Sequence, residues 1–264
     1  QTLERRSDHG RCAVSAQTIR SFARDLVNRN GHPFSVPSDE EAWQKLMYEA
    51  CDLITAISER PKFIALDEAQ DLTEADWWFV GALAESAGLW VFYDDRQRFW
   101  EDRSVPPWIL SDGTKLALPT QYRNPNPVAE FASLYANDVA GATASVPDKV
   151  QMPQGSMSDS ALGIDVVSDA KLVEGTSAAV AGFLRQGARP EDVVVITLSG
   201  RAKSRFADLP ELGRVVVVPA DSPDAGRHVV VDTFLRFRGL ERPFVVITDF
   251  AHMNKPSYAV RMHI

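Results

Sequence analysis

The sequence has few of the residues that build disulfide-stabilised or metal-binding proteins. It contains two cysteines and five histidines among 264 residues. Cys12 and Cys51 lie too far apart in the sequence for a metal-binding cysteine pair, and the histidines are scattered without ligand spacing. These shortages argue against a disulfide framework and a zinc site. They favour a reducing compartment, and we predict a cytoplasmic protein with free thiols.

Long apolar runs are also missing. No stretch approaches the roughly 20 apolar residues that a bilayer-spanning helix needs, and residues 1–20 lack a signal-peptide pattern. We therefore expect no membrane partner. The formal net charge of −8 argues against a protein that coats nucleic acid over its whole surface. A local basic groove is still compatible with that acidic total.

Short runs of Val, Ile and Phe alternate along the chain with amphipathic stretches. This alternation is typical of parallel strands joined by crossover helices, so the sequence predicts an α/β fold. A length of 264 residues suits two domains of ordinary size. The expected strands are residues 12–15, 63–66, 89–93, 163–167, 193–197, 214–218, 229–232 and 244–248.

Capping residues and periodicity predict the helices between these strands. Thr73 followed by Asp76 forms a capping-box pattern, so we expect a helix from there to Ser86, with Gly88 closing it. The other predicted segments are a helix over 127–135 capped by Asn126, a helix over 176–186 ended by Gly187, a mostly helical insertion at about 28–60, and a surface loop or flexible link over 141–160.

Polar side chains follow several of the predicted strands. In open parallel sheets ligands collect at the carboxyl ends of the strands, so we expect these side chains to form one site. Acids, amides and guanidinium groups are what a Mg²⁺-bound nucleoside triphosphate requires. The segments are Asp67-Glu68-Ala69-Gln70-Asp71, Asp94-Asp95-Arg96-Gln97, Gln121-Tyr122-Arg123-Asn124, Asp232-Thr233 and Arg238-Gly239-Leu240-Glu241.

Two other interpretations of the acidic segments are weaker. Asp67 or Asp71 could simply cap a helix that follows the strand. Asp67, Glu68, Asp94 and Asp95 could hold two metals for phosphodiester cleavage, but no histidine lies beside them in the sequence. We therefore favour a nucleotide site over a metal hydrolase.

The motifs resemble those of superfamily 1 DNA helicases of the UvrD/Rep type. Residues 67–71 resemble the DExxQD form of the Walker B motif, and residues 91–97 resemble the next motif, which ends in a phosphate-sensing glutamine. Residues 121–124 are similar to the NYR motif, and residues 231–241 are similar to the T...KGLE motif. Residues 18–22 are similar to the TFHSF segment that contacts single-stranded DNA. These motifs occur in the family's order and span nearly the whole chain.

The resemblance implies two RecA-like P-loop NTPase lobes with parallel sheets, both incomplete, at residues 1–118 and 119–264. The implied activity is ATP-dependent translocation on single-stranded DNA, as in DNA repair, with ATP and Mg²⁺ as cofactors and a monomer as the expected state. The implied roles are Asp67 for Mg²⁺, Glu68 as general base, Gln97 and Arg123 at the γ-phosphate, Gly239 and Glu241 at the nucleotide, and Thr18, Arg20, Phe22 and Thr233 at DNA. Thr18 could instead cap a helix, and Phe22 could belong to a core.

The chain departs from this family in two motifs. No lysine follows a glycine, so the Gly-Lys-Ser or Gly-Lys-Thr loop that cradles phosphates is missing. The family's last arginine motif is missing as well, and truncation of a longer protein would explain both losses. We therefore expect the chain alone to hydrolyse ATP poorly or not at all. The alternative is an ATP-independent nucleic-acid-binding or regulatory module on a helicase-like fold.

Overall fold

The computed structural model describes residues 5–6, 13–32, 35–57, 60–118, 124–136, 162–206 and 208–250. The chain forms two compact units, Gln1–Leu116 and Ala117–Ile264. The sequence-based boundary between residues 118 and 119 lies close to this division. Both units are mixed α/β, one with a parallel sheet and the other with a mixed sheet. Within the described residues no helix combines the length and the apolar character of a transmembrane span.

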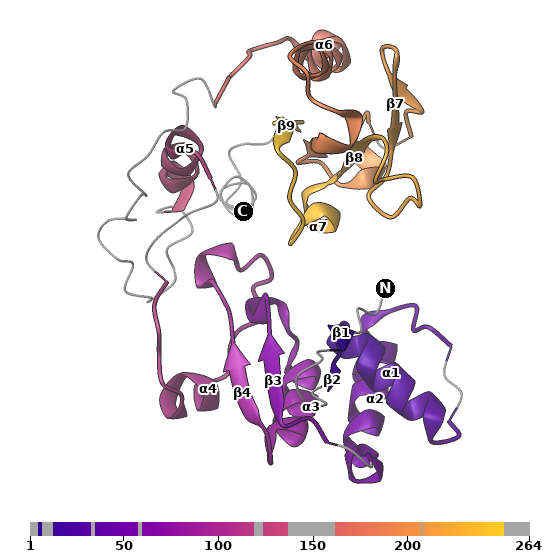
Figure 1. The fold of residues 1–264 in the computed structure, drawn as a ribbon, viewed down its shortest axis with the longest axis vertical. Coiled ribbons are helices and arrows are strands. Elements are labelled where there is room, and N and C mark those ends of the chain that lie inside the picture. Colours follow the sequence, from indigo (N-terminus) through magenta and orange to yellow (C-terminus); the bar gives the residue numbers. More distant parts are fainter. Residues whose placement is uncertain are drawn as a thin grey trace. The chain divides into compact units, whose positions relative to one another are not determined.

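Unit 1 is built on three packed helices beside a small parallel sheet (Figure 1). Helix α1 (Ile19–Arg29) packs on α2 (Glu40–Asp52), which packs on α3 (Glu74–Ala84). Their shared core contains Val27, Leu46 and Phe79, all fully buried. Helix α2 and the short 3-10 helix η1 (Ile54–Ala56) occupy the predicted helical insertion. The other helices described in this unit are α4 (Pro107–Asp112) and the short 3-10 helices η2 (Ala69–Asp71) and η3 (Asp95–Gln97).

The sheet of unit 1 consists of β3 (Phe63–Leu66) and β4 (Gly88–Val91), which pair in parallel. Helix α3 connects them, and one face of the sheet, with Leu66 and Val91, packs against the buried Trp77 and Val80 of that helix. The opposite face exposes Phe63 and Trp90. A two-residue antiparallel pair, β1 (Arg5–Arg6) with β2 (Ala13–Val14), stands apart from this sheet.

The predicted elements of unit 1 are present, but several limits differ. The predicted strand 12–15 is β2 (Ala13–Val14), the predicted strand 89–93 is β4 (Gly88–Val91), and the helix predicted to reach Ser86 ends at Ala84. The capping box is confirmed, because Thr73 and Asp76 exchange the expected side-chain-to-backbone hydrogen bonds. Strand 63–66 has the predicted limits. The prediction that Gly88 closes the helix was wrong: α3 ends at Ala84, and Gly88 is the first residue of β4. Gly88 fits there because Phe63 lies opposite, where a Cβ on Gly88 would come within 2.7 Å of its ring.

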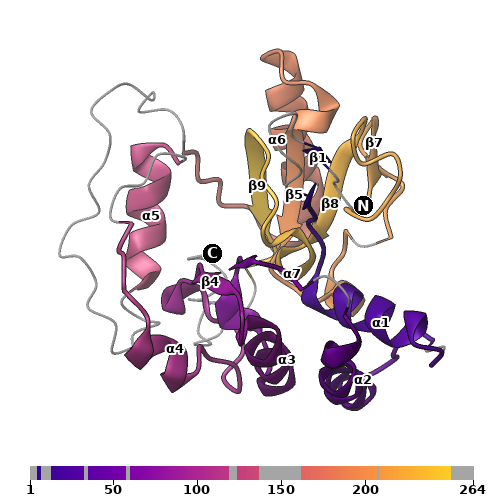
Figure 2. The same cartoon turned by 60° about the horizontal axis from the view of Figure 1, so that its bottom comes forward.

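Unit 2 contains a five-stranded sheet in the order β6-β7-β8-β5-β9. Figure 2 shows its four parallel strands side by side. The short β6 is antiparallel to β7. The strands are β5 (Val193–Thr197), β6 (Glu211–Leu212), β7 (Val215–Val218), β8 (Val229–Thr233) and β9 (Phe244–Thr248).

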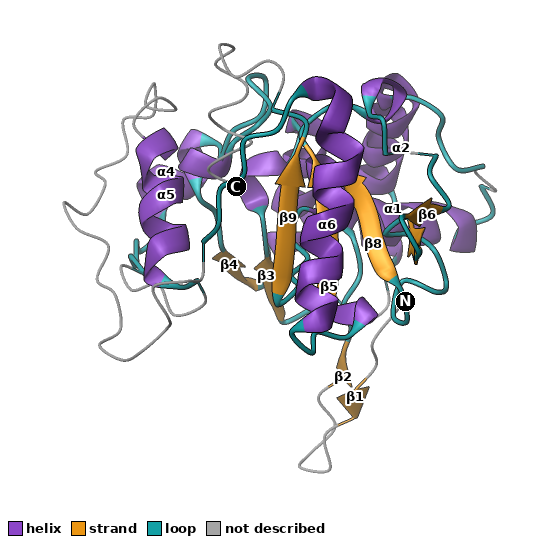
Figure 3. Ribbon diagram, turned by 90° about the horizontal axis from the view of Figure 1, so that it is seen from above, coloured by secondary structure: helices purple, strands orange, loops and turns teal. Residues whose placement is uncertain are grey.

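Helix α6 (Leu172–Arg185) lies across one face of this sheet (Figure 3) and contacts β5 and β9. The short helix α7 (Phe234–Phe237) covers the other face, where Phe237 packs on Val194 and Val230. Helix α5 (Asn126–Ala136) starts at Asn126, so this residue is the first of the helix and not its cap as predicted. The short 3-10 helices of the unit are η4 (Asp169–Lys171), η5 (Pro190–Asp192) and η6 (Arg201–Lys203).

The parallel strands of unit 2 were predicted better than the segments around them. The predicted strands 214–218 and 229–232 are Val215–Val218 and Val229–Thr233 in the structure. Strands 193–197 and 244–248 have the predicted limits. The predicted strand 163–167 was wrong, because this segment forms no ladder and exposes 95% of Val166. Strand β6 was missed, and α6 begins four residues before the predicted Thr176 (176 − 172). The predicted loop 141–160 lies outside the described residues.

Candidate functional site

The carboxyl ends of β3 and β4 lie side by side in unit 1. The ladder continues past both strands, because Phe92 donates its N–H to the Leu66 carbonyl at 2.9 Å and Ala69 donates to the Phe92 carbonyl at 3.0 Å. The acidic segment after β3 therefore meets the turn after β4. Parallel pairing thus brings together two motifs that are more than twenty residues apart in the sequence.

Glu68 sits in a left-handed backbone conformation, with φ 52° and ψ 38°. Such a conformation is uncommon for a residue with a Cβ and costs on the order of 1 kcal/mol, so surrounding contacts must hold it. One such contact is the hydrogen bond that the Glu68 N–H donates to Asp67 Oδ1 at 3.0 Å. Because of this turn the chain changes direction at Glu68, whose side chain is partly exposed, directly after strand β3. Strain of this kind is concentrated at functional sites.

The side chain of Gln70, in the 3-10 helix η2 (Ala69–Asp71), is only 1% exposed. Its Nε2 donates to Glu68 Oε2 at 2.6 Å, and its Oε1 accepts the Asp94 N–H at 3.1 Å. Sequence reasoning gave this residue no role, although it stands in the acidic motif. The feature of the sequence that could have indicated a role for Gln70 is its place as a polar residue between Ala69 and Leu72, both of which pack in the core.

The turn after β4 is organised by Asp94. Its carboxylate accepts the Arg96 backbone N–H at 3.0 Å and the Arg96 guanidinium at 3.1 Å, which caps the 3-10 helix η3 (Asp95–Gln97). Gln97 Nε2 lies 3.5 Å from Asp94 Oδ2. The structure therefore places Asp67, Glu68 and Gln97 at one edge of unit 1.

This edge has the donor chemistry for one type of metal site. Within the described part of the chain no group of three or more His, Cys, Asp or Glu is arranged to hold a metal. Mg²⁺ bound with a nucleotide usually has only one or two protein carboxylates, since phosphate and water oxygens supply the other ligands. Asp67 is exposed and fits that role. The described side chains at this edge do not provide enough ligands to hold Mg²⁺ without a nucleotide.

The remaining residues of the predicted nucleotide site belong to other parts of the chain. Arg123 lies outside the described residues. Gly239 and Glu241 belong to unit 2, in the turn after α7. Gly239 has φ +75°, a conformation that favours glycine, and Glu241 is exposed.

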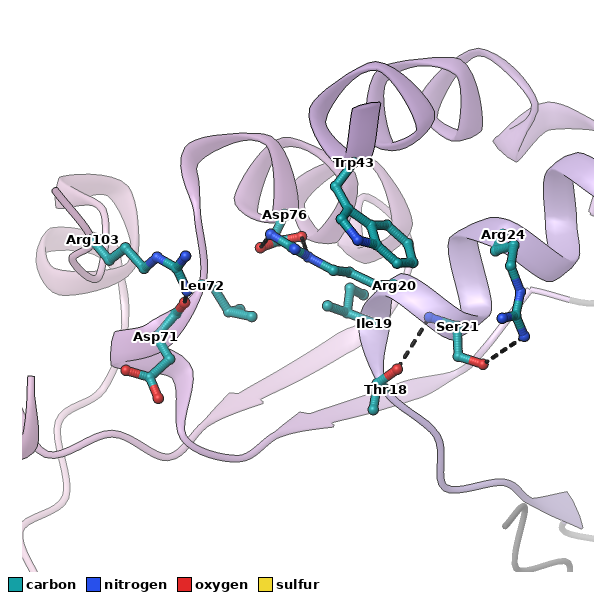
Figure 4. A pocket seen from close by; sticks show the side chains of 10 residues that line it. All are labelled: Thr18, Ile19, Arg20, Ser21, Arg24, Trp43, Asp71, Leu72, Asp76 and Arg103. Carbon is teal, nitrogen blue, oxygen red and sulfur yellow. Dashed lines mark hydrogen bonds and ion pairs between the residues drawn. The ribbon is translucent and has the colours of Figure 1, made fainter. Parts of the chain in front are cut away.

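The first three predicted DNA-contacting residues lie at or near an open pocket of about 510 Å³ in unit 1 (Figure 4). Thr18 is the N-cap of α1, and its hydroxyl accepts the Ser21 N–H at 3.1 Å. Phe22 packs against Phe79 in the helical core, with ring centroids 6.0 Å apart. The pocket is lined by Thr18, Ile19, Arg20, Ser21, Arg24, Trp43, Asp71, Leu72, Asp76 and Arg103.

Arg20 is engaged by two carboxylates. Its Nη1 donates to Glu40 Oε2 at 3.1 Å, its Nε donates to Asp76 Oδ1 at 3.3 Å, and its guanidinium lies over the Trp43 ring. Burial by itself lowers the pKa of Arg20, but its hydrogen bonds and charge interactions with Glu40 and Asp76 outweigh burial and raise that pKa above its ordinary value. Arg20 therefore joins α1, α2 and α3.

The chain matches no protein-family model and no curated protein. The helicase interpretation is therefore a proposal supported by the motifs and the strand-end geometry.

The fourth predicted DNA-contacting residue, Thr233, ends β8 and is 8% exposed. Its N–H donates to Asp232 Oδ1 at 2.8 Å. The buried Asp232 carboxylate also accepts the Ala220 N–H at 2.9 Å and pairs with Arg236 at 3.5 Å. Asp232 thus fixes the backbone around the end of β8.

A second polar cluster at strand ends was missed. Asp249 follows β9 with φ 64° and is 6% exposed. Its carboxylate accepts hydrogen bonds from the hydroxyls of Thr197, at the end of β5, and Ser204, the latter at 3.2 Å. The position of an aspartate directly after a predicted strand was the signal that could have identified it.

Proposed function

We propose that this chain is part of an ATP-dependent DNA helicase or translocase motor of the UvrD/Rep type, built from two RecA-like lobes. The observation that carries the proposal is the meeting of the Asp67-Glu68 pair with the Asp94-Gln97 turn at the ends of two parallel strands. Acidic and amide groups at this edge match the chemistry of a Mg²⁺-nucleotide site.

In this proposal each residue of the edge has one task. Asp67 holds Mg²⁺, which when bound neutralises phosphate charge. Glu68, held in its left-handed turn, accepts the proton of the attacking water. Gln97 contacts the γ-phosphate from the neighbouring turn. Arg123 supplies a transition-state cation, and Gly239 and Glu241 contact the nucleotide.

The chain alone is expected to hydrolyse ATP poorly or not at all. None of its lysines follows a glycine, so it offers no loop in which backbone N–H groups and a lysine cradle the phosphates. Nucleotide binding therefore depends on the carboxylate edge and is expected to be weak. The direct test is binding at this edge, and not turnover.

The test uses Mn²⁺ as a paramagnetic substitute for Mg²⁺ in the presence of ATP. In the ¹⁵N-labelled chain we expect Mn²⁺ to broaden the amide signals of Asp67 to Gln70 and Asp94 to Gln97 before any others. Asp67→Asn should abolish this broadening, since the variant lacks the charged ligand. Asp52→Asn is the matched control, because it makes the same change at the exposed end of α2.

Two results count against the nucleotide site. One is broadening that begins elsewhere in the chain, and the other is broadening at this edge that survives in Asp67→Asn. Either would remove the support that the strand ends give to an ATP-driven motor.

The pocket of Figure 4 favours a second candidate, an ATP-independent nucleic-acid-binding module. Three arginines line it, namely Arg20, Arg24 and Arg103. Their cationic side chains suit a phosphate backbone, and such binding weakens steeply with salt. Salt-dependent binding of a single-stranded oligonucleotide that persists when Asp67 and Glu68 are both replaced by alanine would favour this module over the motor.

A further inference from the structure

We propose that Gln70 is a positioning residue that couples the Glu68 carboxylate to the turn after β4. This inference deepens the proposed function and rests on it, because the proposed function assigns the roles of Glu68 and Gln97. The contacts themselves belong to the free chain and can be tested without nucleotide.

The orientation of the Gln70 carboxamide is dictated by its two partners. The Asp94 backbone N–H can only donate, so it must face the amide oxygen, at 3.1 Å. The Glu68 carboxylate accepts, so it must face the amide nitrogen, at 2.6 Å. Flipping the amide would place donor against donor and acceptor against acceptor. Gln70 therefore fits this position in one orientation only.

Burial makes this link rigid. The Gln70 side chain is 1% exposed and lies between core residues, so water cannot replace either partner without opening the core. A fixed amide restricts the Glu68 side chain, which also starts from a left-handed backbone turn. The same amide fixes the first backbone N–H of the Asp94-Gln97 turn. A displacement at Glu68 is thus transmitted to the turn that carries Gln97.

A second path joins the same two segments and must be separated from the first. Ala69 donates its N–H to the Phe92 carbonyl at 3.0 Å, entirely through backbone. Side-chain substitutions at Gln70 leave this hydrogen bond in place. It therefore serves as an internal reference for intact strand pairing.

The experiment measures amide hydrogen exchange at Asp94 in the free chain. Gln70→Leu removes the acceptor, and we expect Asp94 to exchange about tenfold faster, as for the loss of one buried hydrogen bond. Glu68→Leu removes the other partner of Gln70, and a rise of about threefold is expected at Asp94 because the amide is no longer held. Ala69 exchange should stay unchanged in both variants.

The decisive measurement is the double variant. If Gln70 carries the coupling, Glu68→Leu adds nothing to Asp94 exchange in the Gln70→Leu background. A merely structural role of Gln70 would leave the Glu68 effect in place. Persistence of that effect, or no effect of Glu68→Leu in the parent chain, overturns the proposal. Asp52→Asn, at the exposed end of α2, is the control for loss of a carboxylate away from these contacts and should leave Asp94 exchange unchanged.

Should Gln70→Leu fail to fold, Gln70→Met provides the same decision, because methionine has the length of glutamine but neither its donor nor its acceptor. Glu68→Leu is then expected to have no effect on Asp94 exchange. Sensitivity of Asp94 to Glu68→Leu in that background refutes the coupling. Failure of Mn²⁺ to bind at the strand ends would instead refute the nucleotide site, and the exchange results would still decide the role of Gln70.

Discussion

Asp76 should be one of the most destabilising positions to truncate in unit 1. Its carboxylate is 2% exposed and accepts the Thr73 N–H at 2.9 Å and the Thr73 hydroxyl at 2.7 Å. The same carboxylate accepts from Arg20 Nε at 3.3 Å. Asp76→Ala therefore removes the half of the α3 capping box that Asp76 supplies and the ion pair that joins α1 to α3.

The magnitude follows from these contacts. Loss of one half of a capping box costs up to about 1 kcal/mol. Loss of hydrogen bonds to a buried charged group costs about 1.5–3 kcal/mol. Arg20 keeps Glu40 as a partner, so no buried charge is left unpaired and no further penalty is added. We expect Asp76→Ala to lower the free energy of unfolding of unit 1 by about 3 kcal/mol.

Tryptophan fluorescence isolates unit 1 in a urea titration. All six tryptophans lie between residues 43 and 108, within Gln1–Leu116, so unit 2 contributes no tryptophan signal. With a slope of about 2 kcal/mol per molar urea, the loss corresponds to a midpoint lower by about 1.5 M.

Two matched variants separate the cap from the ion pair. Asp76→Asn keeps an oxygen that can accept from Thr73 but removes the charge facing Arg20, and a loss of about 1–1.5 kcal/mol is expected. Glu40→Gln changes an exposed partner of Arg20, and its effect should stay below about 0.5 kcal/mol. If Glu40→Gln destabilises unit 1 as much as Asp76→Ala does, the buried cap is not the main contribution and the reasoning fails.

Three other properties can be measured on the same chain. Hydrogen bonds from the α2 backbone lower the pKa of Asp39, so the stability that its carboxylate contributes is complete above the unfolded pKa and is lost as pH falls through the lowered pKa. Asp39→Asn should therefore make the urea midpoint of unit 1 less sensitive to acid, and an unchanged pH profile would contradict this. Gly213→Ala should destabilise unit 2, measured by hydrogen exchange, by about 1–2 kcal/mol and by more than Gly187→Ala does. Both glycines have positive φ, but a Cβ at Gly213 would also come within 2.5 Å of Ser177 Oγ, so equal losses of stability would exclude this steric contribution. Burial raises the pKa of the Cys51 thiol, so iodoacetamide should modify it more slowly in the folded chain than in urea, and equal rates would refute that environment.

Helix and strand segments that are specified by interactions between sequence neighbours could be predicted from the sequence. Strands 63–66, 193–197 and 244–248 were found because β-branched and aromatic runs bounded by polar residues have few other stable arrangements. The capping box was found because Thr73 and Asp76 interact within one turn of helix. Segment 163–167 also carries β-branched residues but pairs with no strand in the described part of the chain, and composition alone does not reveal whether a ladder partner exists.

The sequence by itself determined which acids follow which strands, and hence that Asp67, Glu68 and Gln97 stand at strand ends. Only the tertiary structure decided what those and other polar groups contact. Arg20 was predicted to bind DNA, yet it pairs with Asp76, 56 residues away, and Gln70 reaches Asp94 across 24 residues. Such partners are selected by the packing of helices and strands that are distant in sequence, and this packing is set by the whole core and not by any local pattern.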